Sequence, residues 1–589
     1  MFPKFDPTNQ EACLAVLEDV TTNAKQIQES VLENVLSRNA QTEYLKRFLN
    51  GGSDIQSFKK NVPVINYEDF KPYIKRIVNG EPSEIICLQP TITELISSSG
   101  TSAGVPKLIP MTTEEMDRRS LFTPLSVSLL NKQAGGLYQG KALLFFFMNR
   151  DTETPGGLWV GTFITNVLRS YSDRSFLWDR ALSSPLDVSM CRDTKQSMYC
   201  QLLCGLAQRD HVGRFGASFS STFIRVIKFL EAHWRELCSN IRMGHVSEWI
   251  TDIKCRTTVC NILGGRNPEL ADIIEKECDK KSWEGIVRRL WPKAKCIETI
   301  VTGSMAQYVP MVNFYGGGLP LVSAIYGSSE CFFGINLDLL CKLSDVSYTI
   351  IPNSAYFEFL EINRNENETG HGQLVDLVDV KIGHRYEPVV TTFTGLYRYR
   401  VGDVLQATGF HNNTPMFQVV GRQKVALSID LDKTYEEDLE KAVTLAKRLL
   451  EEHNIMLTDF TSYVYTCSFP GHYVLCWELE TKLNDTTLEF DPNTLEECCF
   501  LVEESLDAVY RKYRNYKSIG PLEIKVVKEG TFDELMDFFV SRGSSVSQYK
   551  TPRSVTHEEA LKILESGVVS EFFSKKTPSW KSHEIHSVQ

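Results

Sequence analysis

The pattern of apolar and polar positions near the N-terminus predicts a helix, then a pair of strands, then a second helix. Residues 9–37 carry apolar side chains at three-to-four spacing, which is typical of an amphipathic helix. The apolar-alternating run from Thr91 to Ile96 predicts a strand, and a second short strand is expected at residues 107–110. Thr112 and Glu115 then have the spacing of a capping box, so another helix should begin there.

The middle of the chain mixes helices and strands up to about residue 350 and then changes character. The apolar run Leu319–Ile325 predicts a buried strand that ends in a small-residue turn. Between residues 355 and 421, alternation predicts a series of short strands, of which Tyr356–Ile362 is one. Turns are expected at residues 365–370 and 411–415.

Beyond residue 424 the pattern predicts a smaller α+β unit. Helices are expected at residues 435–454, 495–513, 532–541 and 557–573, and strands at 460–466, 473–480 and 521–528. The turn-rich segment 422–432 is the natural hinge. We therefore expect an α/β protein of two domains, residues 1–424 and residues 425–589.

A stretch rich in Ser, Thr and Gly, residues 97–107, follows the first predicted strand. Glycine lets backbone N–H groups approach an anion closely, hydroxyls add donors and Lys107 adds charge, which suits a loop around phosphate oxygens. The order G-x-x-x-G-x-x-K lacks the Gly-Lys-Ser/Thr of the common nucleotide loop, which argues against a GTPase or a motor. Taken alone, the stretch favours a solvated Ser/Gly turn over a phosphate loop.

Further segments carry candidate chemistry in chain order. Tyr326 and Glu330 flank the small-residue turn after the predicted buried strand, as expected at a ligand crevice. Asp403 follows a glycine in a β-rich stretch, where its carboxylate can accept hydrogen bonds from ribose hydroxyls or from turn amides. Arg398 and Arg400 alternate with tyrosines, so we expect them on one strand face, in a structural or phosphate-proximal role.

Composition narrows the class of protein. The 589 residues include 42% hydrophobic residues, carry a formal net charge of -11 and show no dense basic block, which argues against a nucleic-acid surface. The 16 cysteines are scattered, with no C-x-x-C near Cys191, Cys200 or Cys204, so buried thiols are favoured over a metal site. The longest uncharged apolar run, Ala142–Met148, is too short to span a membrane. We expect a cytoplasmic, reduced, monomeric protein without nucleic-acid or membrane partners.

Taken together, the motifs resemble those of the adenylate-forming superfamily. The matching segments are Ser-Ser-Gly-Thr-Ser-x-Gly-x-Pro-Lys, Tyr-Gly-Ser-Ser-Glu, Tyr-Arg-x-Gly-Asp, Gly-Arg-x-Lys and the lysine in Gln548–Arg553. More narrowly, the chain resembles the plant GH3 family of acyl acid amido synthetases, from about residue 5 to 575. This resemblance implies a large N-terminal domain of mixed sheets and a distorted β-barrel with packed helices, plus a small mobile α+β lid.

The resemblance also implies a reaction that uses ATP and Mg²⁺. A carboxylic acid is first converted to an acyl-adenylate, and the amine of an amino acid then attacks it, releasing AMP. An aromatic or auxin-like acid is expected, such as indole-3-butyrate, a benzoate or chorismate. Two other functions remain open from the sequence: an acyl-CoA ligase with the same intermediate, and a non-catalytic protein that binds a small acid or nucleotide.

The resemblance assigns roles to individual residues. It implies phosphate binding by Ser98, Ser99, Thr101 and Ser102, adenylate binding by Tyr326, Ser328 and Ser329, magnesium binding by Glu330, ribose binding by Asp403 and an adenine-side aromatic at Phe417. It implies that Lys550 reaches the reacting carboxylate and that Lys433 acts at the hinge in one lid position. The expected acyl-pocket residues are Thr123, Ser126, Phe219, Phe223 and Phe332.

Overall fold

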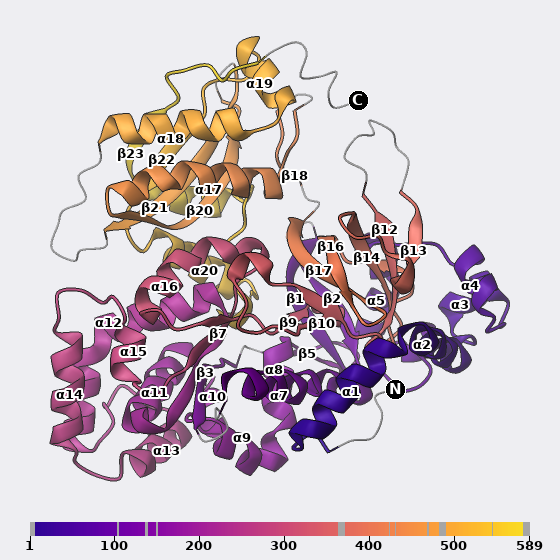
Figure 1. Ribbon diagram of the computed structural model, residues 1–589, viewed down its shortest axis with the longest axis horizontal. Helices are drawn as coiled ribbons and strands as arrows, with labels where there is room; N and C mark the ends of the chain where they lie inside the picture. Colours follow the sequence, from indigo (N-terminus) through magenta and orange to yellow (C-terminus); the bar gives the residue numbers. More distant parts are fainter. Residues whose placement is uncertain are drawn as a thin grey trace.

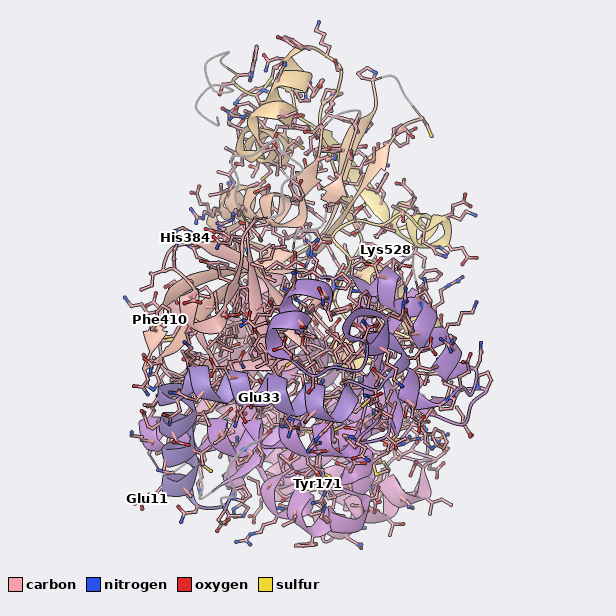
Figure 2. The ribbon with its side chains drawn as sticks, turned by 90° about the vertical axis from the view of Figure 1, so that its right-hand side faces the viewer. Glu11, Glu33, Tyr171, His384, Phe410 and Lys528 are labelled. Carbon is pink, nitrogen blue, oxygen red and sulfur yellow. The ribbon has the colours of Figure 1, made fainter. Side chains whose placement is uncertain are left out.

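A broad body carries a smaller unit above it in the structure, a computed structural model (Figure 1). The view turned by 90° shows the same division, with Tyr171 far down in the body and Lys528 in the upper unit (Figure 2). The structure describes residues 6–102, 105–135, 140–148, 151–362, 372–422, 425–429, 432–467, 470–481, 491–544 and 546–580. We call residues up to 422 the body and residues from 425 the lid.

The N-terminal stretch predicted as one helix is two helices. α1 (Gln10–Thr22) and α2 (Ala24–Asn39) are separated by Asn23, whose backbone leaves the helical region at φ -98° and ψ 28°. Its side-chain amide donates to the Asp19 carbonyl at 3.1 Å, a local bond that competes with helix continuation. The helices that follow are α3 (Glu43–Leu49), α4 (Ile55–Asn61) and α5 (Tyr67–Val78).

The hairpin predicted around the serine-rich stretch is confirmed, but its strands extend further than expected. β1 (Glu94–Ser102) pairs antiparallel with β2 (Val105–Met111), so most of the serine-rich stretch belongs to a strand. β5 (Trp159–Gly161) and β4 (Thr152–Glu153) complete this sheet in the order β2-β1-β5-β4. The predicted helix follows as α6 (Thr113–Ser120), and α7 (Phe122–Ala134) continues from it.

A parallel sheet forms the lower core of the body. Its strands, in spatial order, are β3 (Lys141–Phe145), β6 (Val212–Phe219), β7 (Cys296–Ile300) and β8 (Leu321–Val322). The helices around it are α8 (Phe163–Ser170), α9 (Ser175–Ala181), α10 (Leu186–Ser189), α11 (Thr194–Ala207), α12 (Ser220–Met243), α13 (Ile253–Leu263), α14 (Pro268–Cys278), α15 (Ile286–Leu290) and α16 (Val309–Gly316). Buried side chains of both strands and helices form one apolar cluster, which places the long α12 firmly against the sheet.

An antiparallel sheet forms the upper part of the body. Its strands are β9 (Ile325–Gly327), β10 (Phe332–Asn336), β11 (Tyr348–Ile350), β12 (Tyr356–Glu361), β13 (Leu374–Asp376), β14 (Arg385–Thr391), β15 (Tyr399–Arg400), β16 (Asp403–His411) and β17 (Thr414–Arg422). The expected barrel is an open sheet among the described strands, with β13 and β9 at its edges. The run predicted as one strand at 319–325 is divided between β8 and β9, so it links the two sheets. The predicted turn at 365–370 lies outside the described residues.

The lid is an α+β unit, as predicted. A ribbon of β18 (Val425–Leu427) and β19 (Thr434–Tyr435) leads into a sheet of β20 (Ile455–Tyr465), β21 (His472–Thr481), β22 (Glu523–Val527) and β23 (Val568–Phe573). Its helices are α17 (Glu436–Glu452), α18 (Pro492–Ser505), α19 (Ala508–Asn515), α20 (Thr531–Ser541) and α21 (Glu558–Ser566).

Two predictions for the lid are wrong in detail. The helix expected at 495–513 is interrupted between α18 and α19, because Asp507 caps the second helix by accepting from the Tyr510 amide at 2.8 Å. The helix expected at 557–573 ends at Ser566, and the remaining residues form the strand β23 along β22. This pairing joins residues far apart in the chain, so the strand conformation of residues 568–573 is set by tertiary contacts and not by the local sequence pattern.

The cysteines agree with the expectation of buried thiols. All cysteines are unpaired, and all but Cys260, Cys341 and Cys467 are buried. Among the described residues, no helix has the length and apolar character needed to cross a bilayer.

Candidate active site

The hydroxyls predicted to bind phosphate lie on β1, where its pairing with β2 is irregular. The register shifts between Ser97 and Thr101, so the residues between them bulge from the ladder. Ser98 is half-buried, whereas the side chains of Ser99, Thr101 and Ser102 lie outside the described part of the structure. Bulges of this kind occur beside active sites because they redirect side chains out of the regular ladder.

Tyr326 and Asp403, both predicted to bind nucleotide, meet across the antiparallel sheet. The Tyr326 hydroxyl on β9 donates to Oδ2 of Asp403, the first residue of β16, at 2.8 Å. Both side chains are buried, and the Tyr326 ring stacks on Phe333 with centroids 4.6 Å apart. Gly402 precedes Asp403 at φ +88°, a conformation that favours glycine. The aspartate is therefore held in a fixed orientation by the strand start and by the tyrosine.

Glu330 lies in the turn between β9 and β10 and contacts a second tyrosine. The Tyr399 hydroxyl donates to Oε1 of Glu330 at 3.4 Å, and Nζ of Lys107 donates to the same hydroxyl at 3.3 Å. The Lys107 ammonium lies 5.5 Å from the Tyr67 ring centroid and 5.9 Å from that of Tyr399. Burial raises the pKa of Tyr67, and the charge of Glu330 adds to that effect. This chain of contacts joins the serine-rich hairpin to the carboxylate of Glu330.

The turn itself is shaped by small residues. The Glu330 amide donates to the Ser328 hydroxyl at 3.2 Å, and the Ser328 amide donates to the Cys331 carbonyl at 2.8 Å. A Cβ at Gly327 would come within 2.6 Å of the Phe332 ring, so only glycine fits that position. These contacts fix the backbone that presents Glu330.

Arg119, which the sequence analysis missed, holds this turn from α6. Its Nη1 donates to the Ser329 carbonyl at 3.1 Å and its Nη2 to the Glu330 carbonyl at 2.8 Å. Its Nε contacts Glu115 Oε1 at 2.9 Å, and Arg118 contacts the other oxygen of that carboxylate at 3.2 Å. A signal was present in the sequence, because an acid and a base four residues apart share a helix face.

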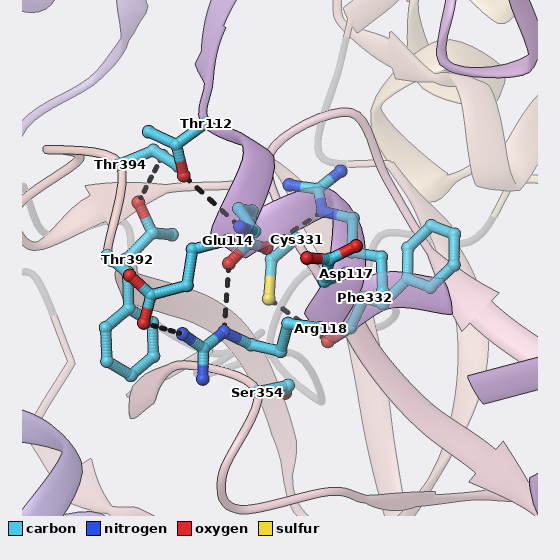
Figure 3. Close-up of polar contacts among 12 residues, drawn as sticks. Thr112, Glu114, Asp117, Arg118, Cys331, Phe332, Ser354, Thr392 and Thr394 are labelled. Carbon is cyan, nitrogen blue, oxygen red and sulfur yellow. Dashed lines mark hydrogen bonds and ion pairs between the residues drawn. The ribbon is translucent and has the colours of Figure 1, made fainter. Parts of the chain in front are cut away.

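The predicted capping box of α6 is only half formed, for the same reason. The Thr112 hydroxyl accepts from the Glu115 amide at 3.2 Å, as expected. The Glu115 carboxylate, however, is engaged by the two arginines. Figure 3 shows Thr112 at the start of the helix and Arg118 beside Glu114. Nη2 of Arg118 lies 3.8 Å from Oε1 of Glu114.

Two of the acyl-pocket candidates, Phe332 and Phe219, are partly exposed. The Phe332 ring centroid lies 5.4 Å from that of Phe122 and 5.0 Å from that of Phe163, and the Arg119 guanidinium lies 5.5 Å from it. Phe219 ends β6, next to the start of α12. The acyl-pocket role of Phe332 and Phe219 stays a prediction.

The other acyl-pocket candidates fit less well. Phe223 is fully buried and packs edge-on against Phe215 with centroids 5.7 Å apart, so this prediction is corrected to a core role. The Ser126 hydroxyl donates to the Phe122 carbonyl at 2.7 Å within its own helix. Thr123 is exposed on the same helix.

Phe417, predicted to face adenine, is also a core residue. Its ring is fully buried, with the centroid of Phe359 4.9 Å away in a stacked arrangement and that of Tyr386 6.3 Å away edge-on. A ring without exposed surface has none to offer a base in this conformation. The structure therefore corrects this assignment.

Arg398 and Arg400 have structural partners. Arg398 contacts both oxygens of Glu358, at 2.9 and 2.8 Å, and donates to the Val62 carbonyl at 2.8 Å. Arg400 contacts Glu387 through Nε at 3.0 Å. Arg398 has φ +47°, so the expected strand face does not continue through it, and β15 begins only at the next residue.

The two lid lysines predicted to act in catalysis are both exposed. Lys550 follows the short helix η8 (Val546–Gln548), and its Nζ lies 5.1 Å from the centroid of the Phe219 ring in the body. Lys433 precedes β19. Its neighbour Asp432 is buried and accepts from the Tyr473 hydroxyl, and burial raises the pKa of Asp432 to about 6.

One group of metal-ligating side chains lies far from these residues in the chain. Ligand atoms of Cys191, Asp252 and Cys255 all lie within 4.8 Å of one another. Asp252 already accepts from the Cys255 amide at 2.9 Å as the cap of α13. The pKa values of both thiols are raised, Cys191 by its contact with Cys255 and by burial, and Cys255 by its contact with Cys200 and by burial. Burial and the cap bond of Asp252 are the roles that the structure shows for these residues.

Comparisons with known proteins cover nearly the whole chain. Models of the GH3 family N-terminal, central and C-terminal domains match residues 13–321, 348–422 and 437–559. The chain is 65% identical over 594 residues to the indole-3-acetic acid-amido synthetase GH3.15 of Arabidopsis thaliana, with 100% of both chains covered. It is 50% identical over 566 residues to the 4-substituted benzoates-glutamate ligase GH3.12 of Arabidopsis thaliana, covering 95% of this chain and 97% of that one. Among solved structures, the AtGH3.15 acyl acid amido synthetase in complex with 2,4-DB matches with a TM-score of 0.92 and 63% identity, covering 99% of this chain and 100% of that chain.

Proposed function

The chain belongs to the GH3 family, and from that premise we propose that it is an ATP-dependent ligase that joins a carboxylic acid to the amine of an amino acid. The observation that carries the proposal is the contact between Tyr326 and Asp403 beside the turn of Glu330. These residues supply carboxylates and hydroxyls that can bind a nucleotide. The whole chain is 65% identical to a named amido synthetase.

The proposed reaction follows from the chemistry of carboxylates. A carboxylate carries no good leaving group at neutral pH, so an amine cannot displace its oxygen directly. Attack of the carboxylate oxygen on the α-phosphorus of ATP forms the acyl-adenylate and releases pyrophosphate. The amino acid nitrogen then attacks the acyl carbon, the bond to AMP breaks, and the amine loses a proton. The chain's contribution is to orient these groups and to stabilise developing charge.

We assign the nucleotide to the upper end of the antiparallel sheet. Asp403 accepts hydrogen bonds from the ribose hydroxyls, in an orientation fixed by Tyr326. Ser328 and Ser329 bind the adenylate through the turn that Arg119 holds. The hydroxyls of β1, from Ser98 to Ser102, bind the phosphates next to Lys107.

A magnesium ion fits this site if the protein supplies one ligand and the phosphates and water supply the others. Glu330 is buried, and its carboxylate lies beside the Tyr399 hydroxyl, so it offers the hard oxygen donor that Mg²⁺ prefers. When bound there, the ion would offset negative charge on the phosphates. Glu330 and the hydroxyls of β1 keep their own roles in orienting the phosphate chain.

The lid is proposed to turn about residues 422–432 as a unit of residues 425–589, with residues 1–424 as the body. Lys550 then stabilises the α-phosphate during adenylate formation, and Lys433 acts in the other lid position. The exposed loop position of Lys550 and its contact with Phe219 in the body support a side chain that is delivered by the lid.

The acyl substrate is proposed to be an aromatic or auxin-like acid. The partly exposed rings of Phe163 and Phe332 lie 5.0 Å apart next to the Glu330 turn, which suits a flat apolar acid. The names of the relatives point to the same class, from indole-3-acetic acid to 4-substituted benzoates. We further propose that the protein acts as a monomer in the cytoplasm, where unpaired cysteines stay reduced.

A product screen by mass spectrometry tests the proposal. Purified protein, ATP and Mg²⁺ are incubated with each of a set of indole, benzoic and phenoxyalkanoic acids, crossed with the standard amino acids and with CoA. We expect an amide of one or a few aromatic acids, together with AMP. Thioesters of CoA without any amide, or no AMP with any pair, would contradict the proposed function.

A further inference from the structure

The loop that carries Lys550 is attached to the body by hydrogen bonds. The Ser547 hydroxyl donates to the Phe147 carbonyl at 3.0 Å, and the Ser221 hydroxyl donates to the Tyr549 carbonyl at 3.2 Å. Phe147 follows β3, and Ser221 lies in the first turn of α12, so both partners belong to the body. The residue immediately before the lysine is therefore positioned by the body in this lid position.

The other end of the same loop is attached to the lid. The Thr461 hydroxyl donates to the Pro552 carbonyl at 2.6 Å, and Nη1 of Arg553 donates to the Phe460 carbonyl at 2.6 Å. Nε of Arg553 contacts Oε1 of Glu440 on α17 at 3.0 Å. This end must move with the lid sheet.

Asp459 on β20 connects the two sets of contacts. The Tyr308 hydroxyl of the body donates to Oδ2 of Asp459 at 2.7 Å, and the Thr551 hydroxyl of the lid loop donates to the same oxygen at 2.5 Å. Oδ1 accepts from the Phe460 amide at 2.8 Å and lies 3.5 Å from Nη1 of Arg553. One carboxylate thus joins the body, the lid sheet and the loop of the lysine.

Local structure in the body and in the lid orients the Tyr308 hydroxyl and the Asp459 carboxylate toward each other. The pairing of β20 with β21 shifts register between Leu457 and Asp459, which turns the carboxylate out of the regular alternation. Tyr308 ends the short helix η5 (Gly303–Tyr308) and is buried. Burial raises the pKa of Tyr308 well above its ordinary value, and the charge of Asp459 adds to this, so the phenol stays a donor.

Several ion pairs also join the body and the lid. Arg225 contacts Asp533 at 2.8 Å, but Asp533 is 65% exposed, and Lys228 contacts Glu480 at 3.1 Å. Arg385 of β14 contacts the buried Glu437 of α17 at 3.2 Å, but Glu437 follows the hinge closely in the chain and lies far from Lys550 in it. A pocket of about 80 Å³ between body and lid lies beside Tyr308 and Asp459, so apolar packing there is incomplete. A buried, directional bond to a carboxylate is worth more than an exposed pair.

We propose that Tyr308 and Asp459 form a latch that sets the lid in the position from which Lys550 acts, with Asp459 as a positioning residue for adenylate formation. The inference rests on the proposed function. Opening the latch breaks the bond to Tyr308, while Thr551, Arg553 and the Phe460 amide stay bonded to Asp459 inside the lid. The lid can therefore leave this position without creating an unpaired buried charge, which would be costly.

The test compares two half-reactions in one variant. Adenylate formation is measured by ATP–pyrophosphate exchange, and amide formation by conversion of supplied acyl-adenylate with an amino acid. Tyr308→Phe removes only the hydroxyl, and exchange should fall about tenfold, the scale of one hydrogen bond to a charged group. Conversion of supplied adenylate should stay near the wild-type rate.

The matched control is Tyr510→Phe. The Tyr510 hydroxyl also donates to a buried carboxylate, Oε1 of Glu503 at 3.0 Å, but both residues belong to the lid. This variant should leave the ratio of the two rates unchanged. Asp459→Asn, which changes the latch from the lid side, should lower exchange relative to amide formation, as Tyr308→Phe does.

Equal losses in both half-reactions, or no loss in either, would overturn the latch for a wild-type protein that is active in exchange. A wild-type protein without exchange for any acid would overturn the proposed function, and the latch with it. The two failures are therefore distinguishable.

Discussion

In the body, Tyr326, Glu330 and Asp403 are buried and belong to one antiparallel sheet and its turn, whereas Lys550 in the lid is exposed on a loop. The body residues contact one another or rigid neighbours, as in the 2.8 Å bond from Tyr326 to Asp403. The loop of Lys550 touches the body through bonds that a lid movement would break, such as that of Ser547 to Phe147.

This contrast suggests that the body residues bind the nucleotide throughout the reaction, whereas the lid residue acts in a single step. Groups fixed in a sheet are in place for every step, so their loss should weaken nucleotide binding throughout the reaction. A group delivered by a movable unit can serve one step and then leave. Substitutions in the two regions should therefore differ in kind as well as in size.

The largest effect is expected in the body, for Asp403→Ala. In the proposed nucleotide site the variant loses both hydrogen bonds to ribose, each worth about 1.5–3 kcal/mol to a charged acceptor, so AMP affinity should fall by a hundredfold or more. Isothermal titration calorimetry measures the affinity of the wild-type protein and the variant for AMP. Asp376→Ala, which removes an aspartate paired with Lys59 at the surface, should bind AMP normally. Unchanged AMP affinity in a folded Asp403→Ala protein would remove Asp403 from the site.

The next effect concerns the stability of the turn that presents Glu330. Arg119→Leu breaks a buried ion pair and two bonds to carbonyls, so unfolding free energy should fall by about 3–5 kcal/mol. Arg38→Leu breaks a half-exposed pair with Glu114 and should cost about 1 kcal/mol or less. Denaturant unfolding measures the free energy of unfolding of both variants. Equal losses of unfolding free energy would show that Arg119 does not support the turn in particular.

In the lid, Lys550→Ala should slow adenylate formation by about two to three orders of magnitude, the scale of losing one electrostatic stabiliser. Conversion of supplied acyl-adenylate to amide should continue at nearly the normal rate. Lys562→Ala, an exposed lysine on α21, should change neither reaction. Equal loss in both reactions of Lys550→Ala would mean that the lid serves a single position.

The smallest effect concerns the hinge, through the pH dependence of stability. Burial raises the pKa of Asp432 to about 6, above its value in the unfolded chain, so the folded state binds this proton more tightly. Stability should therefore fall as pH rises from about 4 to about 6, by up to about 3 kcal/mol. Asp432→Asn should remove that fall. A wild-type and a variant protein with parallel pH profiles would show that Asp432 does not titrate as described.

Short motifs in the sequence point to the candidate residues Tyr326, Glu330 and Asp403, and the structure brings Tyr326 and Asp403 into contact, while their roles in binding stay predictions. Tyr326, Glu330 and Asp403 follow from strand ends and turn glycines, which are local features. Arg119 and Tyr399 join the site through contacts between residues far apart in the chain, and Asp459 reaches Tyr308 across a domain boundary. No local pattern encodes such pairs.

Errors in the fold have the same origin. Asn23 interrupts the N-terminal helix through its own side chain, a local effect that apolar periodicity does not register. The segment Val568–Phe573 was predicted as helix but pairs with β22, since an available sheet edge outweighs helix propensity. The family resemblance placed Phe223 in the acyl pocket and Phe417 beside adenine, yet both rings fill the core.

The most direct test of the central claim is ATP–pyrophosphate exchange by the wild-type protein with an aromatic acid and no amino acid. The account predicts exchange that depends on the acid and on Mg²⁺, because the body and the closed lid form the adenylate before any amine is bound. Exchange that appears only when the amino acid is added would contradict a separate adenylate intermediate, and with it the division of labour between body and lid.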